Sequence, residues 1–269
     1  MAKKIGTLQI LKDIFCNVKL ILNLAVNDFK TRYASSNLGM IWNFVQPVVT
    51  VTIYVFIFQY GFRSAPVSDV PYVLWLVAGI IPWFFFSDIL HGATNSLIEY
   101  TYLVKKVLFK IDILPMVKIV AASFIHVFFI FIGLFLYFIN GERFSIHIIQ
   151  IFYYSACTVF LGMGLSYFCA AVVVFFRDLG QIVNIGLQFG IWLTPIMWQI
   201  DMLPAKLQTI MKLNPMYYIT DGYRNAFYNK QWFFDKPWQT LYFWVFSISA
   251  FVIGTVVFKK LEKHFADVM

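Results

Sequence analysis

Long apolar runs separated by short polar segments dominate the chain. A helix that crosses a bilayer needs about 20 mainly apolar residues, and six runs meet this condition. They lie at residues 38–62, 71–92, 115–139, 148–176, 181–199 and 238–258. The pattern predicts an all-α integral membrane protein with six transmembrane helices. No internal repeat or low-complexity linker divides the sequence, so residues 1–269 are expected to form a single domain.

The segment before the first run has a pattern of its own. Apolar side chains recur three and four residues apart from Leu11 to Phe29, with charged and amide residues mostly between them. This spacing predicts an amphipathic helix over residues 8–34 that lies in the cytoplasmic membrane interface. Packing of the same helix on the protein's own bundle is a compatible alternative. Lys12 and Lys19 interrupt the apolar pattern, which argues against a cleavable signal peptide.

Composition strengthens the membrane prediction. The chain is 61% hydrophobic and 13% charged, whereas a soluble domain has roughly 45–50% apolar and about 25% charged residues. Little room is left for a soluble domain. The net charge is +8, and in a membrane protein an excess of Lys and Arg marks cytoplasmic loops beside membrane lipids rather than a nucleic-acid site.

The distribution of Lys and Arg predicts the orientation. Six spans place both termini on one side of the membrane. If that side is cytoplasmic, it carries 14 of the 21 Lys and Arg residues and the outer side carries seven. Positive residues favour the inside, so both termini of this multi-pass chain are predicted to be cytoplasmic.

Two of the predicted spans carry side chains that could form a transport path. Pro47 removes one backbone hydrogen bond in the first span and should bend it. The fifth span has a polar stripe at helical spacing, and buried amides must face other helices or a wet cavity. The predicted path residues are Trp42, Tyr54, Phe58, Phe62, Gln181, Asn184, Gln188 and Trp192. Ordinary packing remains the alternative for each, and Gly186 and Gly190 would hold the fifth span to a neighbour.

Three connecting segments have further features. Residues 95–109 are predicted to form a short cytoplasmic helix with Lys105 and Lys106 on a basic side. The four-residue turn RDLG begins with Arg177 and Asp178 and forces spans four and five into antiparallel contact. The outer loop, residues 200–237, is predicted to hold two short helices, about 204–213 and 216–228, that dip back toward the membrane. Such segments survive at membrane depth only beside protein or water.

The sequence offers little catalytic chemistry. It has no G-x-x-x-x-G-K-[ST] motif, so no ATP site of that kind is expected, and its three Cys and four His show no metal-binding spacing. Asp88 and His91 could form a proton relay, but a solvated or locally paired role is favoured because they lie close to the interface. No enzymatic set of acid, base or metal ligands stands out.

Several short motifs, in order, resemble those of ABC-2 type permeases. They are Arg32-Tyr33 with Leu38-Gly39, Trp42 and Gln46-Pro47; Ala78 to Trp83 with Phe86-Ser87; Leu103 to Val107 with Phe109 and Ile113 to Pro115; Phe176-Arg177-Asp178; and Leu213-Asn214-Pro215 with Arg224. The resemblance runs from about residue 30 to the tail. It is strongest to permeases that export bacterial O-antigen and teichoic acid, except that Lys110 stands where those usually have Pro.

The resemblance implies an ABC-2 (type V exporter-like) fold and a set of partners. Two copies of the chain would pair, and each would bind a separate ATPase subunit that carries ATP and Mg, with no cofactor on this chain. The cargo would be a polysaccharide on a polyprenyl diphosphate lipid. The implied ATPase-coupling residues are Arg32, Tyr33, Glu99, Lys105, Lys106, Arg177 and Asp178. The implied outer gate consists of Asn214, Pro215, Tyr218 and Arg224.

Other functions remain open at this point. A permease of the same superfamily could carry drugs or lipids, although aromatic and amide surfaces suit sugars better. A channel or proton-coupled carrier would use Asp88 and His91 instead. These hypotheses differ in energy source and cargo, which the sequence alone leaves undecided.

Overall fold

The computed structural model describes residues 2–32, 36–63, 66–67, 70–104, 110–142 and 145–268. Within these ranges the regular structure is helical, apart from one isolated β-bridge between Val67 and Val70. The predicted all-α class is therefore confirmed. Five helical segments in the described part are long and apolar enough to cross a membrane: Gly39–Gly61, Tyr72–Glu99, Ile111–Ile139, Ile146–Val173 and Pro237–His264.

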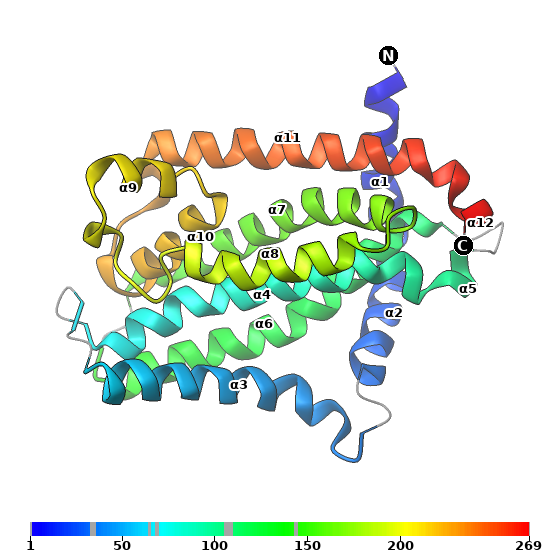
Figure 1. Cartoon of the computed structure of the whole chain (residues 1–269). Helices are drawn as coiled ribbons and strands as arrows, with labels where there is room; N and C mark the ends of the chain where they lie inside the picture. The colour runs from blue at the N-terminus through cyan, green and yellow to red at the C-terminus, as the bar shows by residue number, and fades with distance from the viewer. Residues whose placement is uncertain are drawn as a thin grey trace.

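The long helices lie side by side as a bundle (Figure 1). α4 (Tyr72–Glu99) and α7 (Gln150–Val173) form its centre, and 72% and 67% of their most apolar stretches are buried. α6 (Leu114–Ile139) and α11 (Pro237–Leu261) are one-third buried. α3 (Trp42–Val55) lies at the edge, and only 6% of its span is buried. Helices that are apolar on every side suit these central positions.

The first span matches its prediction closely. It begins with the 3-10 turn η1 (Gly39–Ile41), continues as α3 through Pro47 and ends in the π-helical segment η2 (Phe56–Gly61). α3 changes direction along its length (Figure 1). The internal proline explains this bend because it cannot donate to the carbonyl of Asn43.

The fifth predicted span is shorter than expected. α8 (Leu179–Leu193) has 15 residues, or about 22 Å, so the prediction of one helix over residues 181–199 is wrong at its C-terminal end. Thr194 is extended, with φ −81° and ψ 131°, because the residue before a proline, here Pro195, is pushed out of the helical region. The count of six spans thus remains a prediction.

The N-terminal segment forms two helices rather than one. α1 (Ala2–Cys16) and α2 (Val18–Thr31) are separated at Asn17 and run across one end of the bundle (Figure 1). One side of both helices is buried against the bundle through Ile10, Ile14, Ile21 and Ala25. Phe15 is 75% exposed, so some apolar side chains of these helices face the bundle and others point away from it. Bundle packing is confirmed, and the position of the outward apolar face in the membrane interface remains a prediction.

The predicted cytoplasmic helix over residues 95–109 is also corrected. Residues 95–99 continue α4, which ends at Glu99, and only α5 (Thr101–Val104) follows as a separate helical turn. Lys105 and Lys106 lie outside the described residues, as does Tyr33. Apolar side chains such as Leu97 are buried, which explains why the long helix extends past residue 92.

The outer loop contains the two predicted short helices. α9 (Ala205–Met211) is exposed at the end of the bundle opposite the termini, and α10 (Pro215–Arg224) is mostly buried against α4 and α7. The π-helical segment η6 (Asn225–Asn229) extends α10. Their depth relative to a bilayer remains a prediction.

Candidate functional site

Helices α3, α4 and α8 enclose a cavity of about 420 Å³ that gathers most of the predicted polar path. We call it the amide cavity. Tyr54 comes from α3, the three amides come from one face of α8, and α4 forms the floor. Its polar lining consists of Tyr54, Ser87, His91, Gln181, Asn184 and Gln188. The helical spacing of the amides is what places them on this single face.

Two contacts fix α8 against α4 at this cavity. His91 Nδ1 and Asn184 Oδ1 are 2.5 Å apart in a hydrogen bond. A Cβ added to Gly190 would lie 2.6 Å from the ring of Trp83, whereas Gly186 has no atom within 4 Å of its Cβ position among the described residues. Gly190 therefore makes the predicted close contact, and Gly186 makes no such contact within this chain.

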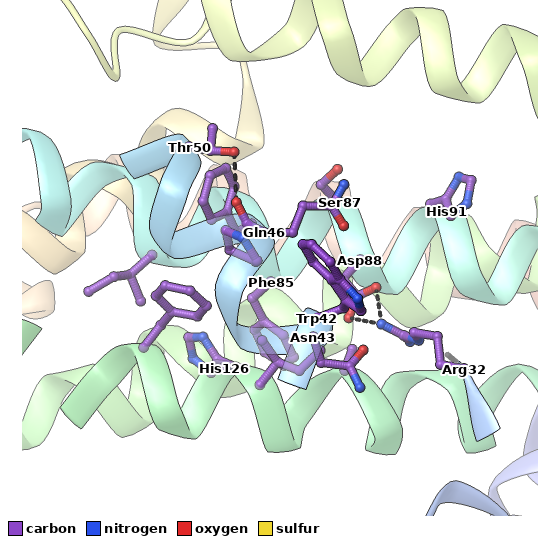
Figure 2. A pocket seen from close by; sticks show the side chains of 16 residues that line it. Arg32, Trp42, Asn43, Gln46, Thr50, Phe85, Ser87, Asp88, His91 and His126 are labelled. Carbon is purple, nitrogen blue, oxygen red and sulfur yellow. Dashed lines mark hydrogen bonds and ion pairs between the residues drawn. The ribbon is translucent and has the colours of Figure 1, made fainter. Parts of the chain in front are cut away.

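A second cavity, of about 310 Å³, lies between α3, α4 and α6 (Figure 2). We call it the charged cavity. It shares Phe84, Ser87 and His91 with the amide cavity, so the two adjoin along α4. Arg32 Nη1 donates to both carboxylate oxygens of Asp88, at 2.9 and 3.1 Å, on one side of it.

The structure divides the eight predicted path residues into two groups. Trp42 lines the charged cavity, and Tyr54 and the three amides line the amide cavity. Phe58 instead stacks on Tyr72, with ring centroids 5.6 Å apart. Phe62 and Trp192 are 71% and 54% exposed, and neither cavity includes them. A common path for all eight stays a prediction.

The residues assigned to ATPase coupling also separate. Arg32 is paired with Asp88, and Glu99 accepts a hydrogen bond from Lys118. Arg177 and Asp178 are exposed in the turn between α7 and α8. The turn lies at the same end of the bundle as α1, α2 and α5 (Figure 1), so these elements border one surface.

Sequence reasoning missed a buried polar cluster at this end. Asp28 Oδ1 accepts from Tyr100 Oη at 2.8 Å and from Lys118 Nζ at 2.5 Å. All three residues are at most 8% exposed, and they join α2 to the ends of α4 and α6. Burial, together with the charge of Asp28, raises the pKa of Tyr100. The sequence feature that could have indicated this cluster is Lys118, a charged residue at the start of an apolar run.

At the opposite end Arg224 has structural partners. Its Nη1 and Nη2 donate to the carbonyls of Pro195 and Ile196, both at 2.8 Å, and its guanidinium lies 3.5 Å from the ring centre of Trp75. Burial lowers the pKa of Arg224 to about 10, so the group stays cationic at neutral pH. The guanidinium thereby satisfies two backbone carbonyls of the turn that follows α8.

The other predicted gate residues support the same region. Asn214 Oδ1 caps α10 by accepting from Met216 N, and its Nδ2 donates to Thr194 Oγ1 at 2.8 Å. Pro215 is the first residue of α10, a position where its missing N–H costs nothing. Tyr218 Oη lies within 3.1 Å of the Tyr153 hydroxyl. A gating role for these residues stays a prediction.

Comparison with known proteins gives the family. A family model described as "ABC-2 type transporter" matches residues 19–228. The chain belongs to the ABC-2 type transporter family.

Within the described residues, no three His, Cys, Asp or Glu side chains are grouped to hold a metal ion.

Several relatives of this ABC-2 protein are polysaccharide transport proteins by name. The O-antigen export system permease protein RfbA of Klebsiella pneumoniae is 28% identical over 254 residues, which are 93% of this chain and 95% of that protein. The permease of the same name from Myxococcus xanthus is 23% identical over 97% of this chain and 99% of that protein. Polysialic acid transport protein KpsM of Escherichia coli is 21% identical over 252 residues, which are 89% of this chain and 92% of that protein.

Proposed function

We propose that this chain is the membrane subunit of an ATP-driven exporter that moves a lipid-linked surface polysaccharide across the bacterial cytoplasmic membrane. The amide cavity carries this proposal. Gln181 and Gln188 are exposed on α8 and Asn184 is half-buried, and together with Tyr54 they line one open space. Amide groups in apolar surroundings need polar partners. Amide groups form hydrogen bonds with sugar hydroxyls, and the faces of aromatic side chains stack on sugar rings. The names of the relatives support the same cargo class.

A second copy of the chain would complete the path. The amide cavity lies between α3, α4 and α8, and most side chains of α3 and α8 are exposed or half-buried in the described chain. Gly186 meets open space within the described structure, which allows another helix to approach closely. A homodimer that brings two such faces together would enclose a channel from two half-sites.

A separate ATPase would supply the energy. The sequence has no P-loop motif, and the exposed turn at Arg177 and Asp178 lies beside the N-terminal helices at one end (Figure 1). The excess of Lys and Arg at this end favours the cytoplasmic side. Two ATPase subunits would bind there, one for each copy of the permease.

The proposal is tested by complementation of a host that lacks the gene. Gln188→Leu, alone and with Tyr54→Ala, should lower the amount of surface polysaccharide on immunoblots while the protein still co-purifies with its ATPase. Phe152→Ala is the control, because Phe152 is 74% exposed on α7. Unchanged polysaccharide with altered drug tolerance would favour a drug or lipid permease instead. Transport that continues without ATP would favour the proton-coupled carrier.

A further inference from the structure

The charged cavity continues into a purely apolar one along the same helices. This apolar cavity has a volume of about 290 Å³ and also lies between α3, α4 and α6. Ile81 of α4 and Phe129 of α6 belong to the walls of both cavities. On α3 the two linings alternate, with Pro47 and Thr50 in the charged cavity and Val48 and Val51 in the apolar one. The two cavities together form one amphipathic slot beneath α3.

The slot exists because α3 does not pack tightly on its neighbours. Only 6% of the span that contains α3 is buried, against 72% for α4. Side chains around an empty apolar space lose their van der Waals contacts. A hydrocarbon chain between Val51, Val77 and Ile132, all in the apolar wall, would restore them.

The polar end of the slot contains unsatisfied groups. His126 Nδ1 and Asn43 Oδ1 have no hydrogen-bond partner within the described residues, although the two residues are 4% and 3% exposed. Buried polar atoms are normally paired, so these two point to a polar ligand. The Arg32 and Asp88 side chains at the same cavity are 23% and 27% exposed. These two groups pair with each other, and a head group that carries both charges can bind beside the pair without separating it.

We propose that the slot binds a membrane glycerophospholipid with a zwitterionic head group. Its phosphate lies near Arg32, its ammonium near Asp88, and one acyl chain fills the apolar cavity. From Val48 to Val55 the apolar wall extends about 10 Å, which suits an acyl chain in one leaflet about 15 Å thick. A polyprenyl diphosphate brings two phosphates and no cationic group to pair with Asp88, so it is less complementary to this head site than a zwitterionic lipid.

Lipid retention by the full chain, purified in mild detergent, tests the tail site. Phosphatidylethanolamine per chain is measured by mass spectrometry of the extracted lipid. Val51→Trp fills the apolar cavity and should reduce the retained lipid about tenfold. Val49→Trp is the matched control, because Val49 is 49% exposed on the same helix and is absent from the wall. Equal retention by the two variants overturns the proposal.

The head group is tested with Asp88→Asn. This change removes the negative partner and keeps Arg32, so the retained lipid should shift from phosphatidylethanolamine toward anionic phosphatidylglycerol. An unchanged ratio contradicts the proposed head site. Recovery of a polyprenyl diphosphate, or of no lipid from the unmodified chain, overturns the whole proposal.

A third measurement needs no variant. Phosphatidylethanolamine with a photoactivatable group in one acyl chain is added to the unmodified protein, and cross-linked residues are mapped. We expect adducts on Ile132 and Leu136, which line the apolar cavity. Adducts on Phe131 and Phe135 instead, which are 65% and 62% exposed on the same helix, would show only surface lipid. The readout is independent of polysaccharide export.

Discussion

At the residue scale, buried charges connect parts of the chain that are distant in sequence. Arg224 joins α10 to the turn after α8 and to Trp75 of α4. Asp28 and Lys118 join α2 to α6 in the same way at the other end. A charged group is kept in such a place only when its partners compensate the loss of water.

Arg224→Lys should destabilise the outer end of the bundle. Lysine keeps the charge but cannot donate to the carbonyls of Pro195 and Ile196 with the same planar fork. Leaving such groups unpaired costs about 1–3 kcal/mol each, so the thermal unfolding temperature in detergent should fall clearly. Lys206→Ala, at an exposed position on α9, is the control. Equal unfolding temperatures for both variants would refute the stabilising role.

Asp28→Ala should loosen α2 from the bundle. Removing one partner of a buried ion pair costs about 3–5 kcal/mol. Lys118 keeps a second carboxylate partner in Glu99, but the Glu99 side chain is half-exposed, so it offsets only part of this loss. Amide hydrogen exchange over α2 should increase. Lys30→Ala, an exposed change on the same helix, should leave the exchange unchanged.

The same pair provides a rescue experiment. Asp28→Leu combined with Lys118→Met removes both buried charges, and apolar replacements of a buried ion pair are often neutral. Protection of α2 should return toward that of the unmodified protein. If the double variant exchanges as fast as Asp28→Ala, the pair is not what holds α2.

At the element scale, the contact between α7 and α11 depends on glycine. A Cβ on Gly164 would lie 2.6 Å from the backbone nitrogen of Phe251, and Gly254 faces the backbone of Gly164. Gly162, also on α7, packs closely on α4, because a Cβ there would lie 2.6 Å from the side chain of Ile89. Backbone atoms cannot move aside as a flexible side chain can.

Gly164→Ala should therefore be costly although alanine favours helix. Overpacking costs about 1–3 kcal/mol, more than the roughly 1 kcal/mol gained in helix propensity. Gly186→Ala gains the same propensity and meets no atom of the described residues, so it should leave the unfolding temperature of the isolated chain unchanged or higher. Thermal unfolding of the two variants compares these effects directly. A stabilised Gly164→Ala protein would contradict the close contact.

At the scale of the whole molecule, one end of the bundle is suited to a soluble partner. The N-terminal helices cross this end, and the turn with Arg177 and Asp178 is exposed beside them (Figure 1). The opposite end carries α9 and the buried α10. The two ends thus differ in both charge and accessible surface.

Arg177→Glu should weaken binding of the proposed ATPase by about tenfold if an acidic partner meets this turn. Co-purification at two salt concentrations measures the effect. Arg63→Glu is the matched control, since Arg63 is exposed beyond the other end of the first span. Equal recovery of ATPase with both variants would remove this turn from the coupling surface.

The sequence alone determined the class and much of the organisation. Apolar runs of spanning length predicted the existence of four long helices, and the first span to within one residue at each end, because length and hydrophobicity are local properties. Helical spacing also placed Gln181, Asn184 and Gln188 on one face. The second short helix of the outer loop was predicted from Met216, one residue after the observed start of α10 at Pro215.

Only the tertiary structure decided which surfaces meet. It showed that Thr194 and Pro195 end α8 early, that Asp28 is buried against the bundle, and that Phe58 packs on Tyr72. It also revealed the slot beneath α3, which no motif marks. These outcomes depend on contacts between residues far apart in the chain, and local periodicity carries no information about such pairs.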